Sequence, residues 1–512
     1  MVGPELAREL AEISLDLGRQ VGILVDRTGN VDLVLVGDHR QIVLPDLGRA
    51  RGALTRLLGL RLIHTHLNNE GITQDDINDL AQLRLDLVAA LLPSPEGHAP
   101  AVELAYLVPS EDANDSVIRT SAPHVGALGI DFKELIGSLE TELAFRQRAV
   151  VSTGGGDRAL LVNATSMSRH EVEHRLAELK ELARTAGLTV VDQLVFRQRH
   201  GPSASVLSSD RLQQINILAL QNGVDLLVFD QDLSPSQVDR LTHMTELRII
   251  DRTQLILDIF AQRAQTREGK LQVEMAQLKY LLPRLHGKGI AMSRLTGGIG
   301  ARGPGETKLE IDRRRVRERL ARLKKDLDLV KAQRERHRAR RAKAELPIIS
   351  IVGYTNAGKS TLLNNLTQSN VMAENKLFAT LDPSSRRLRF PRDRSVIITD
   401  TVGFIQDLPP DLMEAFSATL EELTSADLIL HVIDGASPRL EQQIGTVEGL
   451  LADLELAVKP MIRVLNKSDL LDGETISNLT RRYDAVAISA VNPATFPPLL
   501  ARMGGSLGID TE

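Results

Sequence analysis

Residues 347–366, which read PIISIVGYTNAGKSTLLNNL, decide the fold of the C-terminal part of the chain. An apolar stretch with strand character, IISIV, leads into a glycine-rich turn, and the turn opens a helix. Positions 353–360 match the pattern G-x-x-x-x-G-K-[ST]. Glycines in such a turn let successive backbone N–H groups face an anion, and the helix N-terminus adds a partial positive charge. The stretch therefore predicts a phosphate-binding loop between a buried strand and a helix.

The positions of this loop have distinct expected roles. Lys359 is expected to neutralise the outer phosphates of a nucleotide, and the hydroxyl of Ser360 to bind Mg²⁺. The backbone around them forms the phosphate cradle. The residues that we expect to bind the nucleotide here are Gly353, Tyr354, Thr355, Asn356, Ala357, Gly358, Lys359, Ser360 and Thr361.

Two downstream segments are expected to face the same phosphates. DTVG, at 400–403, follows the apolar strand SVIIT, so Asp400 can hold Mg²⁺ and Gly403 can offer its N–H to the terminal phosphate. Thr380, in LFATLDP, lies between the first helix and Asp400. We interpret it as a switch threonine that binds Mg²⁺ only when the third phosphate is present. Lys359, Thr380 and Gly403 are the expected catalytic residues.

The nucleotide base is predicted to be guanine. NKSD, at 466–469, follows the strand MIRVL, and a fixed carboxylate at Asp469 can accept two N–H bonds from guanine. Adenine offers no such pair of donors, so the site favours GTP over ATP. A backbone N–H of a later loop can meet the guanine oxygen. The residues expected to bind the base are Asn466, Lys467, Asp469, Ser489 and Ala490.

The residue after Gly403 bears on the rate of hydrolysis. Many GTPases have a glutamine there that orients the attacking water, whereas this chain has Phe404. A phenyl ring makes no such hydrogen bond, so we expect slow hydrolysis unless a partner supplies or orders the missing group. The alternative is that Phe404 merely packs under the switch and that intrinsic turnover is adequate.

The order of these motifs resembles the HflX family of ribosome-associated GTPases, which are P-loop GTPases of the Obg–HflX type. The resemblance covers roughly residues 150–500 and rests on GGIGARGPGE, GYTNAGKST, FATLDP and DTVGFI. It implies an α/β N-domain, a helical hairpin and a GTP-binding domain. It also implies binding to the large ribosomal subunit, with GTP-controlled splitting or rescue of stalled or idle ribosomes.

The composition of the 512 residues is ordinary for a globular protein, and their number predicts several domains. The alternation of apolar strands with amphipathic helices predicts a multidomain α/β protein. The absence of cysteine excludes disulfides and thiolate metal sites. We find neither a signal-peptide pattern nor an apolar run long enough to span a bilayer, and we expect a cytoplasmic protein, monomeric away from the ribosome. The predicted domains are an extra N-terminal α/β domain at 1–147, an HflX-type α/β domain at 148–268, a basic helical hairpin at 269–345 and the GTPase domain at 346–512.

The hairpin is predicted from two heptad patterns that flank GGIGARGPG. Leucines and other apolar residues at 271–285 and 309–330 recur at spacings of three and four, which favours an antiparallel coiled coil with a kink at Pro283. Residues 302–345 carry 17 Lys/Arg against 8 Asp/Glu. Such a basic helix favours contact with folded RNA over a solvated flank, and the resemblance implies ribosomal RNA. GIGARG matches a dinucleotide fingerprint, but it joins two helices, so we interpret the match as fortuitous.

The middle domain departs from the family pattern at one position. Relatives commonly carry a G-x-G-K turn before the helix that corresponds to VLSSDRLQQI. Here Ser208, Ser209, Asp210 and Arg211 stand in its place, which puts a second nucleotide contact there in doubt.

The N-terminal segment contains a second candidate site, LIHTHLNNEGITQDDINDL. His64 and His66 alternate on one strand and therefore share a face, and Asp76 begins a helix. The arrangement resembles the zinc pattern of JAMM/MPN-type metalloproteases, although Leu67 replaces the usual proline and the spacing matches only in part. Zn²⁺ is the candidate ion. We interpret the segment as an MPN-like fold that serves as a structural or docking module. A working zinc site, for which Glu5, Glu9 and Glu12 are the available general bases, and two histidines with ordinary hydrogen bonds are the alternatives.

Three functions follow from these patterns. The first is a GTPase that binds the large ribosomal subunit and splits or rescues ribosomes. The second is a metallohydrolase at His64, His66 and Asp76 that the GTPase regulates. The third is a GTP-gated RNA-binding scaffold without splitting activity.

Overall fold

A computed structural model describes residues 3–45, 57–68, 70–94, 98–110, 116–150, 156–197, 206–285, 308–342, 346–367, 377–378, 384–389, 395–401, 403–406 and 423–508. The chain divides into two compact units. One combines Met1–Lys180 with Gly187–Asp251, and the other combines Glu181–Ala186 with Arg252–Glu512. The candidate switch residue Thr380 and the GGIGARGPGE stretch at 297–306 lie outside the described residues. In the described part of the chain, no helix has the length and apolar character needed to cross a bilayer.

The first unit begins with a six-stranded sheet of order β2-β1-β3-β4-β5-β6, in which only β3 and β4 pair in parallel. Ser14 Oγ and Thr65 Oγ1 lie 2.7 Å apart, so the first helix covers the sheet face that Thr65 occupies. His64 and His66, one residue to either side, therefore point to the opposite face. The elements are α1 (Pro4–Leu17), β1 (Val21–Asp26), β2 (Val31–Val36), β3 (Leu60–Thr65), α2 (Gln74–Gln82), β4 (Leu87–Leu92), β5 (Ala101–Leu107), β6 (Val117–Ala122), η2 (Val125–Ala127) and α3 (Phe132–Val150).

The same unit contains a second, fully parallel sheet of order β10-β9-β7-β8. Its apolar strands are buried, as strands between crossover helices must be. The 19-residue helix α3 runs across residue 147, where the sequence had suggested a domain boundary. The elements are β7 (Arg158–Thr165), α4 (Arg169–Thr185), β8 (Thr189–Arg197), α5 (Ser209–Asn222), β9 (Leu226–Phe229), α6 (Pro235–Met244) and β10 (Arg248–Asp251).

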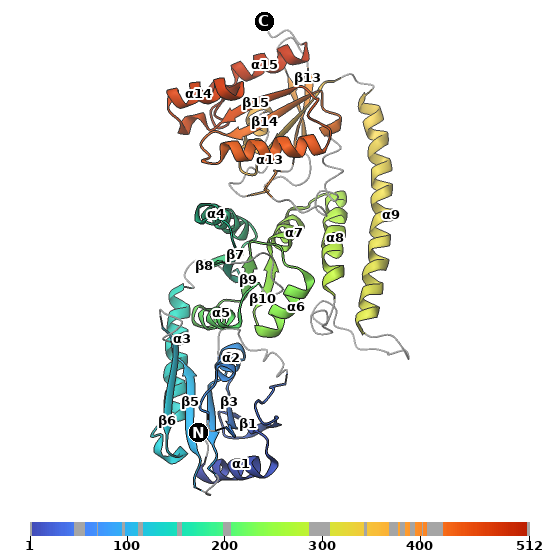
Figure 1. The fold of residues 1–512 in the computed structure, drawn as a ribbon. Coiled ribbons are helices and arrows are strands. Elements are labelled where there is room, and N and C mark those ends of the chain that lie inside the picture. The colour runs from blue at the N-terminus through green and yellow to red at the C-terminus, as the bar shows by residue number, and fades with distance from the viewer. Residues whose placement is uncertain are drawn as a thin grey trace. The chain divides into compact units, whose positions relative to one another are not determined.

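The second unit contains the predicted helical hairpin, whose two long helices lie side by side (Figure 1). Val316 and Leu323 of α9 are buried on the hairpin seam, and Arg319 makes two bonds of 2.7 and 2.8 Å to the Glu274 carboxylate of α8. Pro283 lies in a 3₁₀ turn directly after α8, as its lack of an N–H dictates. The elements are α7 (Arg252–Arg263), α8 (Arg267–Leu281), η4 (Leu282–Arg284) and α9 (Lys308–Ala342).

A third sheet, of order β12-β13-β11-β14-β15-β16, forms the C-terminal domain. All its pairs are parallel except that of the edge strand β12 with β13. The carboxyl ends of β11, β13 and β15 meet at one edge, which is where ligands bind in open α/β sheets. The elements are β11 (Ile348–Gly353), α10 (Lys359–Thr367), β12 (Ser384–Arg389), β13 (Ser395–Asp400), β14 (Leu428–Asp434), α13 (Leu440–Asp453), β15 (Met461–Asn466), η5 (Ser468–Leu470), α14 (Gly473–Tyr483), β16 (Ala485–Ala487), η6 (Pro493–Thr495) and α15 (Pro497–Leu507).

Candidate nucleotide-binding site

The two glycines of the loop between β11 and α10 each lie too close to a different neighbour to carry a side chain. Gly353 and Gly358 adopt φ values of +153° and +95°. A Cβ on Gly353 would overlap the carbonyl oxygen of Val432, and one on Gly358 would overlap the side-chain nitrogen of Asn466. Asn356 also has a positive φ, of +62°, which asparagine tolerates well. The loop backbone is therefore wound tightly at the start of α10, in the form that a phosphate cradle requires.

Lys359 is folded back into this loop. Its side chain is buried, and Nζ donates to the carbonyl oxygens of Gly353 (3.0 Å) and Tyr354 (2.8 Å). A Cβ on Gly403 would lie 3.0 Å from this Nζ, so the glycine leaves the space beside the ammonium group open. A triphosphate that enters the loop can therefore reach Lys359 and the Gly403 backbone together.

The two described magnesium candidates are adjacent. Ser360 Oγ donates to Asp400 Oδ2 at 2.7 Å, and the Asp400 side chain is fully buried at the end of β13. The next residue is also fixed, because Thr401 Oγ1 donates to Ile351 O at 2.7 Å. A hydroxyl and a carboxylate are the hard oxygen ligands that Mg²⁺ prefers, so the residues present fit this ion. The third candidate, Thr380, is not among the described residues.

Asn466 connects the three loops around the base site. Its Nδ2 donates to Ala357 O, and its Oδ1 accepts from Ala490 N, both at 2.7 Å. The side chain is buried, whereas Asp469, three residues on, is exposed. Asn466 thus acts through the loops that it holds together, and Asp469 is the carboxylate available to guanine.

The remaining base-site residues already have protein partners. Lys467 has a φ of +63° and forms an ion pair of 2.7 Å with Asp434 at the end of β14. Ser489 N donates to Thr495 Oγ1 at 3.0 Å, and Ala490 N donates to Asn466. A guanine contact by either N–H of this loop would replace one of these bonds.

Phe404 extends the central sheet. Its N–H donates to Gly353 O (3.2 Å), its carbonyl accepts from Thr355 N (2.7 Å), and it forms a parallel bridge with Tyr354. The phenyl ring is only 4% exposed. Phe404 therefore packs beneath the loop, and no part of its side chain can orient a water molecule.

Three contacts that no sequence pattern indicated anchor segments next to the site. Phe378, two residues before Thr380, stacks edge-on against Phe260 of α7 with ring centroids 4.7 Å apart, although its φ is +54°. Leu377 N donates to Thr185 Oγ1 at 3.3 Å. Gln406, after Phe404, donates its N–H to the Tyr354 hydroxyl at 2.9 Å. Both segments next to the phosphate loop are thus tied to fixed neighbours.

Replacing Phe378 with alanine should destabilise the second unit. The ring is 2% exposed, and truncation of a buried phenylalanine costs about 3–5 kcal/mol. We expect a corresponding loss in the denaturant midpoint of the nucleotide-free protein. Phe145→Ala is the matched control, because Phe145 is 74% exposed and should change stability by less than about 0.5 kcal/mol. Equal effects of the two substitutions would contradict the anchoring role of Phe378.

The burial of Lys359 should make the affinity for GTP depend on pH. Burial lowers the pKa of Lys359 to about 8, while the nearby Asp400 carboxylate opposes the shift. A bound triphosphate favours the charged amine and raises the pKa again. GTP affinity should then be constant well below pH 8 and fall up to about tenfold per pH unit above it, until the pKa of the complex is reached. Calorimetric titration between about pH 7 and 9 measures this, and a flat profile would contradict it.

The second candidate site lies in the other compact unit. The ligand atoms of His64, His66 and Asp76 lie within 4.8 Å of one another, and all three residues are buried. Burial lowers the pKa of His64 to about 4, so its imidazole is neutral at physiological pH. The structure thus brings the two histidines, which the sequence predicts on one strand face, together with Asp76 at the start of α2.

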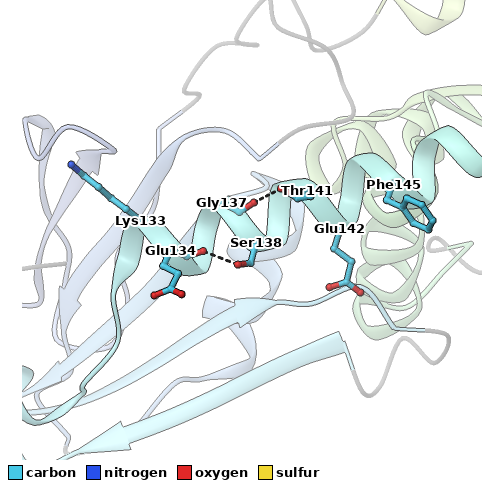
Figure 2. Close-up of a pocket in the computed structure, with 7 residues that line it drawn as sticks. All are labelled: Lys133, Glu134, Gly137, Ser138, Thr141, Glu142 and Phe145. Atoms are coloured by element: carbon cyan, nitrogen blue, oxygen red, sulfur yellow. Dashed lines mark hydrogen bonds between the residues drawn. The ribbon is translucent and has the colours of Figure 1, made fainter.

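A pocket on α3 has a different character. Figure 2 shows that its lining residues all come from one helix. Ser138 Oγ and Thr141 Oγ1 donate to the carbonyl oxygens of Glu134 and Gly137, one turn earlier in the same helix. The lining offers no converging set of ligands.

Comparison with known proteins agrees with this site. Three family models match in succession: "GTP-binding GTPase N-terminal" at 173–261, "GTP-binding GTPase Middle Region" at 263–341 and "50S ribosome-binding GTPase" at 348–467. GTPase HflX of Caldanaerobacter subterraneus subsp. tengcongensis is 47% identical over 70% of this chain and 82% of its own. GTPase HflX of Escherichia coli is 41% identical over 70% and 85%. A GTP-binding protein of Sulfolobus solfataricus, solved with GDP, is 24% identical over 69% of this chain and 99% of its own, with a TM-score of 0.38.

Proposed function

Because the chain belongs to the HflX family of GTPases and hydrolyses GTP, we propose that it binds the large ribosomal subunit and uses GTP to split or rescue stalled or idle ribosomes. The family model that matches the phosphate loop is described as a 50S ribosome-binding GTPase. That match is the observation that carries the proposal. The proposal includes a cytoplasmic location, in association with ribosomes.

The described residues have separate proposed roles in binding GTP. Asp469 selects guanine, Asn466 holds the loops that surround the base, and the backbone at 353–358 binds the phosphates. Lys359 and the Gly403 N–H hold the terminal phosphate. Ser360 and Asp400 would hold Mg²⁺, which supplies positive charge to the phosphate oxygens when bound. Thr380 is proposed to join them in the GTP state.

The burial of Phe404 supports the dependence on a partner. Hydrolysis needs a group that orients the attacking water, and the side chain at this position is turned into the protein. We propose that the ribosome supplies or orders that group, so that turnover is slow until the protein is bound. Binding of the protein to the ribosome and hydrolysis of GTP are then coupled.

The basic face of α9 supports an RNA partner. Arg315 and Arg317 are exposed, as is much of this helix, whereas Arg319 is held by Glu274. Exposed arginines on a rigid helix suit phosphate contacts with folded RNA. We propose that this face binds ribosomal RNA.

Co-sedimentation with purified large subunits tests the proposal. We expect binding to be strongest with a non-hydrolysable GTP analogue, weaker with GDP, and accompanied by faster hydrolysis of GTP. The double substitution Arg315→Ala/Arg317→Ala should weaken binding by roughly tenfold or more and reduce its salt dependence. Arg481→Ala, at an exposed position of α14, is the control and should bind normally. Hydrolysis that is indifferent to subunits would overturn the proposal.

The two other candidate functions make different predictions. A GTP-gated RNA-binding scaffold would bind subunits without lowering the light scattering of intact ribosomes, whereas a splitting factor would lower it. A metallohydrolase at His64, His66 and Asp76 needs a general base, but Glu5, Glu9 and Glu12 are exposed residues of α1, which covers the opposite face of the sheet. This geometry favours the ribosome function over the hydrolase.

A further inference from the structure

Three metal-ligating side chains converge on the face of the first sheet that α1 does not cover. His64 Nε2 lies 3.2 Å from Asp76 Oδ1, and His66 Nε2 lies 3.6 Å from Asp76 Oδ2. The residues are only 2%, 3% and 6% exposed in the order His64, His66, Asp76. Two imidazoles and one carboxylate are therefore gathered in a nearly closed space between β3 and α2.

His66 and Asp76 are each oriented by hydrogen bonds to neighbouring residues. His66 Nδ1 lies 3.0 Å from the carbonyl oxygens of Glu70 and Gly71, so Nδ1 carries the proton and the lone pair of Nε2 faces Asp76. Thr73 donates its N–H and its hydroxyl to Asp76 Oδ2 at 2.7 and 2.8 Å. A metal-ligating histidine and carboxylate typically have such supporting partners.

His64 is not satisfied by the protein alone. Neither of its ring nitrogens has a hydrogen-bond partner among the residues that the structure describes, although the side chain is almost fully buried. An imidazole in such a place normally finds a partner, because an unmet buried polar group is destabilising. An ion held between Nε2 and the Asp76 carboxylate would give one of these two nitrogens a partner.

The loop that carries the cluster is braced from the sheet. Glu103 of β5 accepts from Ile72 N at 3.1 Å, and Arg119 of β6 donates to Ile72 O at 3.0 Å. The N–H and the carbonyl oxygen of Ile72, directly before Thr73 and α2, are thus both held by hydrogen bonds. The positions of His66 and Asp76 relative to β3 are set before any ion binds.

We propose that His64, His66 and Asp76 bind one zinc ion in the N-terminal sheet domain. Two imidazole nitrogens and one carboxylate oxygen are zinc ligands, whereas Mg²⁺ prefers an all-oxygen set. A water molecule takes the fourth position. The ion joins β3 to α2 and so stabilises the domain.

The test uses the full chain, stripped with a chelator and then titrated with Zn²⁺ and, as a spectroscopic probe, Co²⁺. We expect one Zn²⁺ per chain, the visible absorption of four-coordinate Co²⁺, and a higher melting temperature of the chain on adding Zn²⁺. Asp76→Asn and His64→Gln should each weaken Zn²⁺ binding by on the order of 100-fold and abolish the thermal shift.

Two controls make the result decisive. His170 and His174 form an exposed pair on α4, with their Nε2 atoms 3.0 Å apart, and could hold zinc adventitiously. His170→Ala should leave the tight site intact. GTP affinity, which depends on the other compact unit, should be unchanged in Asp76→Asn and His64→Gln. An unchanged circular dichroism spectrum of the zinc-free protein reports that the first unit of these variants is folded. Zinc binding that is equal in wild type and both variants, or that is lost in His170→Ala, would overturn the proposal.

Discussion

Asp469→Asn is expected to weaken GTP binding by about 100- to 1000-fold and to create affinity for xanthosine triphosphate. The substitution removes one of the two hydrogen-bond acceptors that the donor pair of guanine requires. The carboxylate is proposed to accept from the guanine ring N–H and from its exocyclic amine. An asparagine keeps one acceptor but presents an NH₂ group to that amine. Xanthine has a carbonyl oxygen in its place, so the substituted amide can donate to it.

Competition of XTP and GTP for a fluorescent nucleotide measures this exchange of specificity. Asp469 is exposed and makes no contribution to the core, so the fold should be unaffected. Asp453→Asn, at the end of α13, changes the charge equally and should leave both affinities unaltered. A variant that loses GTP without gaining XTP would mean that Asp469 holds the loop and does not read the base.

Asn466→Ala should weaken GTP and GDP alike, by roughly 100-fold. The side chain is 2% exposed, and its loss leaves the Ala357 carbonyl and the Ala490 N–H without their partner. Each unmet buried group costs about 1–3 kcal/mol, and the cost falls on the loops that form the nucleotide site. Equilibrium binding of a labelled GDP measures the loss.

The set of nucleotides that lose affinity distinguishes the effect of Asn466→Ala from that of Asp469→Asn. Asn466 is predicted to act by holding loops, so GTP, GDP and XTP should all lose affinity by similar factors. Asn365→Ala removes one bond from α10 to the same loop, at Ala490 O (2.7 Å), and should have a smaller effect. An Asn466→Ala protein that loses only guanine nucleotides would show direct recognition of the base.

The chemistry of the site could be predicted because it depends on local order. The phosphate loop is one continuous strand, turn and helix, and Asp400 and Asn466 end strands that must meet at one edge of a parallel sheet. His64 and His66 could be placed on one face because strand side chains alternate. Neither prediction required knowledge of what packs against these elements.

Long-range packing could not be predicted in the same way. The heptad of α8 indicated Leu271 and Met275 as the seam, yet they are half-buried, whereas Val273 and Ala276 are buried. The reason is that α8 packs against α7 as well as α9, so its apolar surface is shared between two neighbours. The contact of Phe378 with Phe260 joins segments more than a hundred residues apart and leaves no local pattern.

The position of Phe404 has an evolutionary consequence. A mutation to glutamine would not simply install a water-orienting amide, because this side chain points into the core and its backbone is paired on both sides with the phosphate loop. The amide would be buried without a partner, at a cost of about 1–3 kcal/mol, before any catalytic gain. Under the proposed dependence on a partner, a self-sufficient, fast enzyme is separated from this one by a destabilised intermediate, and selection on turnover acts on the surfaces that meet that partner.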